Sequence, residues 1–490
     1  MSNSKRTVVL FNPACLKKIG EFTLPMGLML TAIHLYEKFR VVIVDQMIEN
    51  HWEWKSKLSA LLDERPVCIG ITAMTGKQIK EGLRVSEIAR DKGCPVVWGG
   101  IHASLLPAQT CAHPLVDYVV EGEGEESFAE LVEALASGRS CAGIPGVWHK
   151  ENGEPASGGQ REFLKVNELP PIPYHLVDVA EYIQPGPFGK SLVFYSSRGC
   201  PQRCAFCFNY RINRFRWRPF SSDRVLEDIR RIRAEHPDIR HVQFWDDNFF
   251  ASLKRAREIG EGIQQMRPAL TWSCLGTHVR DVMRMDDEYL GCMRDTGLKE
   301  VVVGAESGSQ SIIDMVRKNF LVEELLESNK RLGDFGIRPT YSFISGVLGA
   351  DDEEHIKKTV EVMFKLKKDN AHAVLGSIKP LIYYPGTELY GKAVDMGFSP
   401  PQHLEEWSDF VWNNYMDLKF PWFSTQRQRQ LNYLYYYTLL MSPNYAFIKS
   451  RLFRFVATIL RPFAEWRVKR LCFRLPLAAW GMHLFQRYCV

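Results

Sequence analysis

The sequence predicts an α/β protein with a doubly wound, Rossmann-like parallel sheet, then a partial (β/α)6 barrel, then a mostly helical C-terminal region. Three observations carry this prediction. Short apolar runs alternate with helical stretches over residues 7–98, a stretch rich in Gly and Pro covers 141–190, and six more apolar runs recur from 192 to 378. Continuous apolar strands with helices between them are typical of parallel sheets that are buried on both faces.

The first region supplies four strand candidates with helices between them. Strands are expected at residues 8–11, 41–44, 67–71 and 96–98, and helices near 27–39, 54–62 and 79–90. The segment after the first strand, residues 11–15, reads Phe-Asn-Pro-Ala-Cys. Because it contains no Gly-x-Gly-x-x-Gly, a nucleotide-binding Rossmann domain is disfavoured.

Three loops that contain glycine are expected at the carboxyl ends of these strands. Ligands of doubly wound sheets bind at that edge, and glycine lets the backbone approach a bulky ligand closely. The sequence therefore predicts a ligand site there, with tight turns as the structural alternative. The residues are Thr72, Met74, Thr75 and Gly76 in the first loop, Gly99, Gly100 and His102 in the second, and Glu121, Gly122 and Gly124 in the third.

The second region repeats strands and helices in the manner of a barrel. Its strands are expected at residues 192–195, 241–245, 270–274, 300–303, 340–344 and 374–378. Chemistry in such barrels takes place at the carboxyl ends of the strands. Polar residues gather there, because Asp246 and Asn248 follow the second strand, Glu306 and Ser307 follow the fourth, and Ser345 ends the fifth.

Three cysteines follow the first of these strands with the spacing C-x3-C-x2-C, at Cys200, Cys204 and Cys207. Four thiolates close a four-iron cluster or a structural zinc site, whereas three leave one metal open to a further ligand. A zinc site needs another Cys or His at short spacing, yet the next ones are His236 and Cys274. The pattern therefore favours an iron–sulfur cluster with an open iron.

The cysteine segment resembles the radical S-adenosylmethionine (SAM) superfamily. Phe206 matches the aromatic residue that usually precedes the last cysteine, and residues 192–195 resemble the first barrel strand. The resemblance implies a 4Fe–4S cluster on the three cysteines, with SAM chelated by the open iron. It also implies SAM contacts for Phe206, Asp246, Asn248, Glu306, Ser307 and Ser345. A helix N-cap is the alternative interpretation of Asp246.

Residues 5–140 resemble the cobalamin-binding domain that precedes the barrel in many radical SAM enzymes. The resemblance runs through residues 24–28, 99–102 and 121–125, and it implies cobalamin contacts for the three glycine-containing loops. The Asp-x-His-x-x-Gly motif, which supplies a histidine to cobalt in other cobalamin proteins, does not occur in the sequence. Met74 or a neighbour would then face the metal. For His102 a contact with the nucleotide tail and a hydrogen bond to backbone remain alternatives.

The predicted domains are a cobalamin-binding domain at 1–142, a linker at 143–190, a radical SAM partial barrel at 191–395 and a helical C-terminal region with a basic tail at 396–490. The net charge of the chain is +5, but residues 449–490 hold nine Lys and Arg against the single Glu465. This tail suits peripheral contact with an acidic membrane, with a solvated helix face as the alternative.

The localisation expected from the sequence is cytoplasmic, with possible attachment to a membrane surface. Twelve cysteines are scattered without a paired pattern, and residues 1–6 lack the apolar segment of a secretion signal. The apolar runs of the tail are interrupted well short of the roughly 20 residues that a spanning helix needs. Residues 210–220 alternate Arg with aromatics, but no further basic module follows, so no nucleic-acid partner is predicted.

The resemblance implies a cobalamin-dependent radical SAM methyltransferase. It would transfer a methyl group from methylcobalamin to an unreactive carbon or phosphorus of a small molecule or lipid, with an external electron donor of the flavodoxin or ferredoxin type. A cyclase or oxidoreductase such as the anaerobic porphyrin-ester cyclases is the enzymatic alternative. From another class of protein, a corrinoid-binding redox sensor without turnover is the distant alternative.

Overall fold

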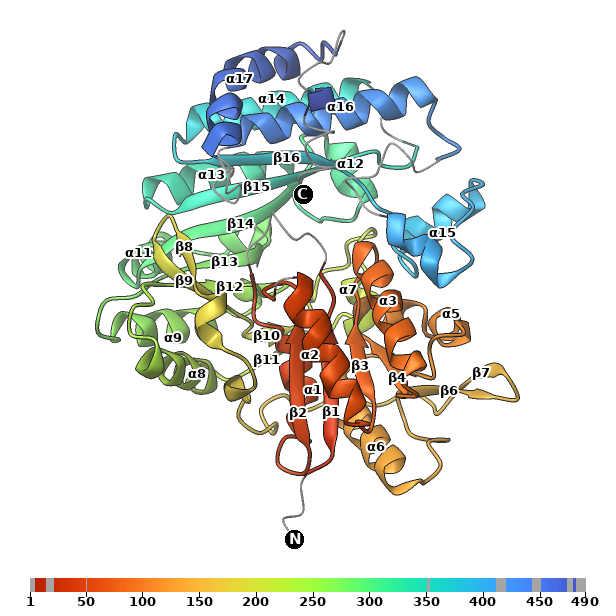
Figure 1. Cartoon of the computed structure of the whole chain (residues 1–490). Helices are drawn as coiled ribbons and strands as arrows, with labels where there is room; N and C mark the ends of the chain where they lie inside the picture. Colours follow the sequence, from red (N-terminus) through yellow and green to blue (C-terminus); the bar gives the residue numbers. More distant parts are fainter. Residues whose placement is uncertain are drawn as a thin grey trace. The chain divides into compact units, whose positions relative to one another are not determined.

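The computed structural model describes residues 5–14, 22–49, 51–349, 353–410, 420–442, 451–473 and 479–481. The chain divides into two compact units (Figure 1). The N-terminal unit contains Met1–Lys17, Phe22–Tyr182 and Pro400–Val411. The barrel unit contains Lys18–Glu21, Ile183–Ser399 and Trp412–Val490.

The N-terminal unit is built on a seven-stranded sheet in the order β2-β1-β3-β4-β5-β6-β7. Its first five strands are parallel, and β6 and β7 are antiparallel. The strand order reverses between β1 and β3, which is where ligands of doubly wound sheets bind. The strands are β1 (Thr7–Asn12), β2 (Arg40–Asp45), β3 (Ile69–Thr72), β4 (Val96–Gly99), β5 (Tyr118–Val120), β6 (Val147–Glu151) and β7 (Glu154–Ser157).

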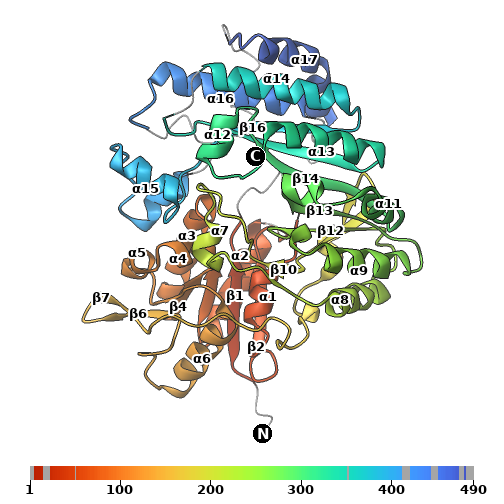
Figure 2. The same cartoon turned by 180° about the vertical axis from the view of Figure 1, so that it is seen from behind.

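Helices cover both faces of this sheet, with α1 and α6 packed together on one face and α2 and α3 on the other (Figures 1 and 2). They bury apolar residues at helical spacing, such as Ile79, Val85 and Ala89 of α3. The helices are α1 (Met26–Thr31), α2 (His51–Asp63), α3 (Lys77–Asp91), α4 (Gly100–Leu105), α5 (Pro107–Ala112) and α6 (Gly124–Ser137), with short 3-10 turns η1 (Tyr174–Leu176), η2 (Val179–Tyr182) and η4 (Leu404–Asp409).

Two segments of the N-terminal unit differ from the boundaries expected from the sequence. Residues 143–182 contain β6 and β7 where the sequence predicts a linker, and this hairpin pairs with the edge of β5. The segment with η4 returns to this unit from the C-terminal region. There the Trp407 indole donates to Gln109 Oε1 at 2.7 Å, and Gln109 Nε2 donates to the Gln402 carbonyl at 2.7 Å.

The barrel unit confirms the predicted partial barrel. Its sheet has the order β16-β15-β14-β13-β12-β9-β8. The six strands from β9 to β16 in this sheet are parallel and follow chain order, whereas β8 is an antiparallel edge. The strands are β8 (Gln184–Gly186), β9 (Gly189–Phe194), β12 (His241–Phe244), β13 (Thr271–Thr277), β14 (Leu298–Glu306), β15 (Arg338–Ser345) and β16 (Val374–Pro380), with a separate pair β10 (Ser197–Arg198) and β11 (Arg218–Pro219).

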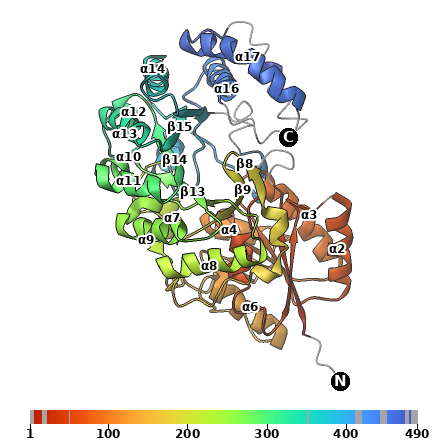
Figure 3. The ribbon, with the colours of Figure 1, turned by 90° about the vertical axis from the view of Figure 1, so that its left-hand side faces the viewer.

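Helices lie along the outer side of this curled sheet, as Figure 2 shows for α8, α9, α11 and α13. At the far end α16 packs on β16, where the Thr438 hydroxyl accepts from the Ile378 amide at 2.9 Å, and α17 packs on α16 and α14 (Figure 3). The helices are α7 (Asn209–Asn213), α8 (Ser222–Glu235), η3 (Phe249–Ala251), α9 (Leu253–Gln264), α10 (Val279–Met283), α11 (Asp287–Asp295), α12 (Gln310–Met315), α13 (Val322–Asp334), α14 (Glu353–Asp369), α15 (Glu388–Asp395), α16 (Thr425–Met441) and α17 (Arg451–Lys469).

Candidate active site

The cysteine loop leaves β9 through a turn that requires glycine. Gly199 has φ +80°, and a Cβ atom there would lie 2.1 Å from the Arg216 carbonyl oxygen. A larger residue would therefore force this loop away from the segment that ends in β11. The loop closes with a hydrogen bond from the Cys207 amide to the Cys204 carbonyl at 3.1 Å.

Cys204 is buried, whereas Cys200 and Cys207 are half-buried. Burial raises the pKa of the Cys200 thiol to about 11 and that of Cys207 to about 12, so both are protonated without a metal. Among the described residues, no three His, Cys, Asp or Glu side chains converge as ligands of a single ion would. In an iron–sulfur cube each thiolate bonds a different iron, and three cysteines on one short loop are a donor set that fits such a cluster.

Asp246, at the carboxyl end of β12, holds the start of the cysteine loop. Its carboxylate accepts from the Ser196 amide at 2.7 Å, from the Ser196 hydroxyl at 2.7 Å and from the Ser197 hydroxyl. Asp247 accepts from the Gly199 amide at 3.2 Å. The N-caps of the next helical turns are Asn248 for η3 and Ser252 for α9, so neither aspartate acts as a helix cap.

Glu306 ends β14 in a left-handed backbone conformation, with φ +58°. Such a conformation costs a non-glycine residue about 1–3 kcal/mol, and residues held in it cluster at functional sites. Its Oε1 accepts from Lys318 Nζ at 2.6 Å, and both side chains are nearly buried. Although burial disfavours the Lys318 charge, the Glu306 carboxylate raises the Lys318 pKa above its ordinary value.

Two polar atoms at the carboxyl ends of the strands are buried and have no hydrogen-bond partner in the described structure. They are Asn248 Oδ1 after β12 and Ser345 Oγ at the end of β15. An unsatisfied buried polar atom costs about 1–3 kcal/mol, so a polar cofactor that supplies the missing partners fits this edge. Ser307 differs, since its hydroxyl pairs with the Thr359 hydroxyl at 2.9 Å.

Several residues at this edge are not among the site residues expected from the sequence. The Lys318 ammonium lies 5.9 Å from the ring centre of Phe206, and Arg255 donates to the Ser196 carbonyl at 2.6 Å. The ring of Tyr384 packs edge-on against Phe208, with 5.3 Å between ring centres. Lys318 follows Glu306 by twelve positions in a charged turn, and no local pattern in the sequence indicates that the two side chains meet.

The run of Arg and aromatic residues after the cysteines forms a stack inside the barrel unit. The rings of Tyr210 and Phe215 are nearly parallel at 5.1 Å, and the Arg203 guanidinium lies 4.7 Å from the Phe215 ring centre. The Tyr210 hydroxyl donates to the Gly386 carbonyl at 2.8 Å. This stack joins the cysteine loop to the loop that follows β16.

The glycine-containing loops of the N-terminal unit meet at the carboxyl edge of its sheet. Gly100 has φ +87°, and a Cβ atom there would lie 2.5 Å from Thr72 Oγ1. The Ala73 carbonyl accepts from the His102 amide at 3.0 Å, and the Ala73 amide donates to the Gly99 carbonyl at 3.1 Å. The loops after β3 and β4 are therefore one closely packed structure, which the sequence predicted as two neighbouring segments.

His102 is fully buried within these loops. Its Nδ1 pairs with the Thr75 hydroxyl at 3.0 Å, and its Nε2 is buried without a partner in the described structure. Burial lowers the pKa of His102 to about 4, so its ring is neutral at physiological pH. The ring also lies 5.7 Å from that of Trp407.

The other residues predicted to contact cobalamin include ones that are more exposed to solvent than His102. Met74 is 50% exposed, which leaves its thioether available at the surface of the loop after β3. Glu121 accepts from the Trp148 indole at 2.7 Å, and Gly122 has φ +78° with open space where a Cβ atom would lie. An exposed thioether, an open glycine turn and the orphaned His102 nitrogen together fit a bulky polar cofactor at this edge.

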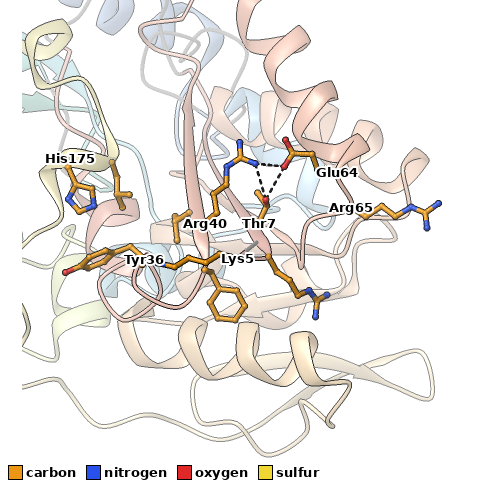
Figure 4. A pocket seen from close by; sticks show the side chains of 11 residues that line it. Lys5, Thr7, Tyr36, Arg40, Glu64, Arg65 and His175 are labelled. Atoms are coloured by element: carbon orange, nitrogen blue, oxygen red, sulfur yellow. Dashed lines mark hydrogen bonds and ion pairs between the residues drawn. The ribbon is translucent and has the colours of Figure 1, made fainter. Parts of the chain in front are cut away.

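A cavity of about 800 Å³ lies at the opposite edge of the same sheet, beside the amino ends of β1 and β2 (Figure 4). Its side chains include Lys5, Thr7, Arg40, Glu64 and Arg65. The Arg40 guanidinium donates hydrogen bonds there to the Glu64 carboxylate and to the Thr7 hydroxyl. Since ligands of doubly wound sheets bind at the carboxyl edge, this cavity lies away from the predicted cobalamin loops.

A half barrel whose first strand runs into a loop with three cysteines defines a protein of the radical SAM class. The profile of the radical SAM superfamily matches residues 194–363, and that of the B12 binding domain matches residues 14–132. An uncharacterized methyltransferase of Pyrococcus horikoshii is 32% identical over 384 residues, which cover 77% of this chain and 80% of the relative. The chain belongs to the cobalamin-dependent radical SAM enzymes, and its cofactors are a 4Fe–4S cluster, SAM and cobalamin.

Two further relatives differ in the reactions that their names describe. The anaerobic magnesium-protoporphyrin IX monomethyl ester cyclase of Rubrivivax gelatinosus is 27% identical over 346 residues, 67% of this chain and 59% of that protein. The cytidylyl-2-hydroxyethylphosphonate methyltransferase of Streptomyces wedmorensis is 24% identical over 375 residues, 69% of this chain and 68% of that protein. The family thus contains both methyltransferases and cyclases.

Solved structures show the same fold. The cobalamin-dependent radical enzyme OxsB with aqua-cobalamin and SAM bound has a TM-score of 0.72 at 16% identity, covering 99% of this chain and 75% of that one. The radical SAM methyltransferase TsrM from Kitasatospora setae, with cobalamin and the cluster bound, has a TM-score of 0.64 at 20% identity, covering 80% and 79%. These likenesses confirm the predicted fold class.

Proposed function

We propose that this enzyme is a methyltransferase that moves a methyl group carried by cobalamin to an unreactive carbon or phosphorus of a small molecule or lipid. The observation that carries the proposal is the relative at 32% identity, which is named as a methyltransferase and is matched over most of both chains. When bound, the cluster and SAM supply radical chemistry and cobalamin supplies methyl transfer, and the protein positions these groups.

The residues of the barrel unit have distinct parts in this proposal. Cys200, Cys204 and Cys207 hold the cluster, and Asp246 fixes the loop that carries them by accepting three hydrogen bonds from Ser196 and Ser197. Asn248 and Ser345 offer SAM their unpaired buried oxygens.

Glu306 and Phe206 both lie near the Lys318 ammonium and complete the proposed SAM site. Lys318 holds the Glu306 carboxylate in one orientation, ready to accept from ribose hydroxyls or an ammonium group. Ser307 contributes to the SAM site indirectly. Its hydroxyl pairs with that of Thr359 and so shapes the turn that carries Glu306.

The N-terminal unit holds cobalamin through the loops after β3, β4 and β5. Gly99, Gly100, Gly122 and Gly124 let the backbone approach the corrin, and Thr72, Thr75 and Gly76 shape the first loop. Met74 faces the cofactor because its side chain is the exposed one of that loop. His102 supports the loop through Thr75, and Glu121 is oriented by the Trp148 indole.

A cyclase is the second candidate function, and the Rubrivivax gelatinosus relative at 27% identity supports it. In that case cobalamin would handle electrons rather than a methyl group. Both candidates need an external electron donor, which we propose is of the flavodoxin or ferredoxin type.

The test is an anaerobic assay of the protein reconstituted with iron, sulfide and cobalamin, with reductant and SAM but no substrate. A methyltransferase is expected to form S-adenosylhomocysteine together with methylated cobalamin. Formation of 5′-deoxyadenosine alone would favour the cyclase, and binding of the cofactors without any product would favour a sensor.

A matched pair of variants assigns these products to the cluster. Cys204→Ala removes a proposed ligand and is expected to abolish 5′-deoxyadenosine while cobalamin stays bound in the N-terminal unit. Cys292→Ala, on α11, is expected to behave as the wild type, because Cys292 lies outside the cysteine loop. Equal 5′-deoxyadenosine from both variants would contradict the assignment.

A further inference from the structure

Helix α17 exposes a continuous apolar face, which consists of Phe455, Ile459, Phe463 and Trp466. Their exposed fractions are 64%, 60%, 43% and 44%. With 100° of rotation per residue, these four positions fall within a sector of about 80° of the helix. An exposed row of large apolar side chains on a protein surface marks an interaction site more often than chance.

The helix is held in place by its opposite side. Ala457, Ala464 and Val468 are fully buried or nearly so, and α17 packs there on α16 and α14. Arg461 donates two hydrogen bonds to the Met441 carbonyl at the end of α16, at 2.9 and 2.7 Å. The small residues therefore face the barrel unit and the large aromatic ones face outward, which is the reverse of what burial in the core would favour.

Cations accompany the α17 face. The Arg470 guanidinium lies 5.2 Å from the ring centre of Trp466. Lys469 is exposed too, and its ammonium lies 4.4 Å from the ring centre of Phe364 on α14. The Arg467 guanidinium, 4.8 Å from the ring centre of Phe463, is buried and donates to the Cys472 carbonyl at 3.2 Å, so it supports that ring from the inner side. In the sequence, residues 449–490 carry nine Lys and Arg and a single acid, Glu465.

We propose that α17 docks on the surface of an anionic lipid bilayer, with the α17 face in the boundary between headgroups and acyl chains. Aromatic and aliphatic side chains on one face of a helix with Lys and Arg nearby are the features of helices that lie in a membrane interface. Lys469 and Arg470 then contact lipid phosphates at the end of the helix. The strongly positive tail disfavours a second copy of this chain as the partner, because two such surfaces would repel each other.

The proposed orientation is parallel to the membrane rather than across it. In the described parts of the chain, no helix has the length and apolar character needed to cross a bilayer. Helix α17 is 19 residues long and contains Pro462 and several charges, which suits an interfacial helix. This inference does not depend on the proposed methyltransferase function, since the α17 face lies on the outside of the barrel unit.

The test is cosedimentation of the full-length reconstituted protein with vesicles of phosphatidylcholine alone or of phosphatidylcholine with phosphatidylglycerol. Binding is expected only to the vesicles with anionic lipid, and raising the salt concentration is expected to weaken it. No binding to either vesicle would overturn the proposal. Equal binding to both vesicles would also overturn it, because the cations would then have no part.

Substitutions on and beside the α17 face separate its contribution to vesicle binding from nonspecific adsorption of the protein. Ile459→Glu is expected to weaken vesicle binding about tenfold or more, and Lys469→Gln or Arg470→Gln about fivefold each. Trp466→Ala is compared with Trp52→Ala, since Trp52 lies on α2 and is 76% exposed. Only Trp466→Ala is expected to weaken vesicle binding. Equal losses of binding in the two variants would contradict the assignment to α17.

Two measurements on the same variants separate lipid docking from misfolding and from dimer formation. Unchanged thermal unfolding and iron content of each variant show that α17 substitutions leave the fold intact. Sedimentation velocity without lipid reports the oligomeric state, and a dimer that dissociates on Ile459→Glu would show that a second copy covers the α17 face instead of a membrane.

Discussion

Single carboxylates in the barrel unit differ in the kind of partner that holds them. Asp246 accepts only neutral donors, from two serines, whereas Glu306 pairs with the buried ammonium of Lys318. A buried ion pair adds little net stability, but removing one partner leaves an uncompensated charge and costs about 3–5 kcal/mol. Removing Lys318 is therefore expected to destabilise the fold, because the Glu306 carboxylate would lose its counterion.

Lys318→Met is expected to destabilise the barrel unit by about 3–5 kcal/mol, because the Glu306 carboxylate would remain buried without a counterion. The measurement is urea unfolding of the protein before cluster reconstitution. Lys392→Met is the matched control, since Lys392 pairs with Glu388 on the surface and such pairs contribute about 0–1 kcal/mol. The double variant Lys318→Met/Glu306→Gln should recover much of the loss, and a double variant as unstable as the single one would contradict this role of the ion pair.

At the scale of elements, the strands were predictable because buried parallel strands are continuous apolar runs. All six barrel strands occur where residues 192–378 predict them. The hairpin of β6 and β7 was harder to predict, because it contains Gly153 and Pro155, residue types that usually indicate a linker. Helix α1 ends at Thr31, eight residues before the end of the helix expected near 27–39, because the following residues form turns.

The candidate site was predictable only where residues act close together in the sequence. The three cysteines form a local motif, so their loop could be found directly. The partners of Asp246 lie about fifty positions away at Ser196 and Ser197, and Lys318 meets Glu306 only because α12 turns the chain back. Such contacts depend on the curvature of the sheet, which a single sequence does not encode in any local pattern.

The turn before the cysteines allows a test at the element scale. Gly199→Ala is expected to lower iron and sulfide incorporation several-fold, because its Cβ would collide with the Arg216 carbonyl. Gly336→Ala is the matched control, since Gly336 also has a positive φ, +68°, but has open space around it. The control is expected to lose about 1 kcal/mol of stability while binding iron normally. Equal iron in the two variants would show that the cysteine loop tolerates the added atom.

At the scale of the whole molecule, both units bury histidines whose rings are neutral, His102 in the N-terminal unit and His241 and His278 in the barrel unit. In the N-terminal unit burial lowers the pKa of His102 to about 4. In the barrel unit burial, assisted by the cations of Arg338 and Lys299, lowers the pKa of His241 to about 3. The His241 nitrogens pair with the hydroxyls of Thr271 and Ser273 at 2.8 and 2.9 Å.

These histidines predict a loss of stability in acid. Below about pH 6.5 the unfolded chain takes up a proton on each of them while the folded chain does not, so the free energy of unfolding falls as pH falls. The slope is about 1.4 kcal/mol per pH unit for each histidine, down to the folded pKa of about 4 for His102 and about 3 for His241.

Urea unfolding across this pH range measures the effect, and His241→Gln tests its origin in the barrel unit. Glutamine retains a donor and an acceptor for the Thr271 and Ser273 hydroxyls but does not titrate, so the variant should lose stability less steeply in acid than the wild type. His372→Gln, at an exposed position, is expected to leave the slope unchanged. Because His102 and His241 lie in different units, His241→Gln should flatten only the transition of the barrel unit. A wild type and a His241→Gln variant with parallel profiles would show that this histidine is not the source of the acid sensitivity.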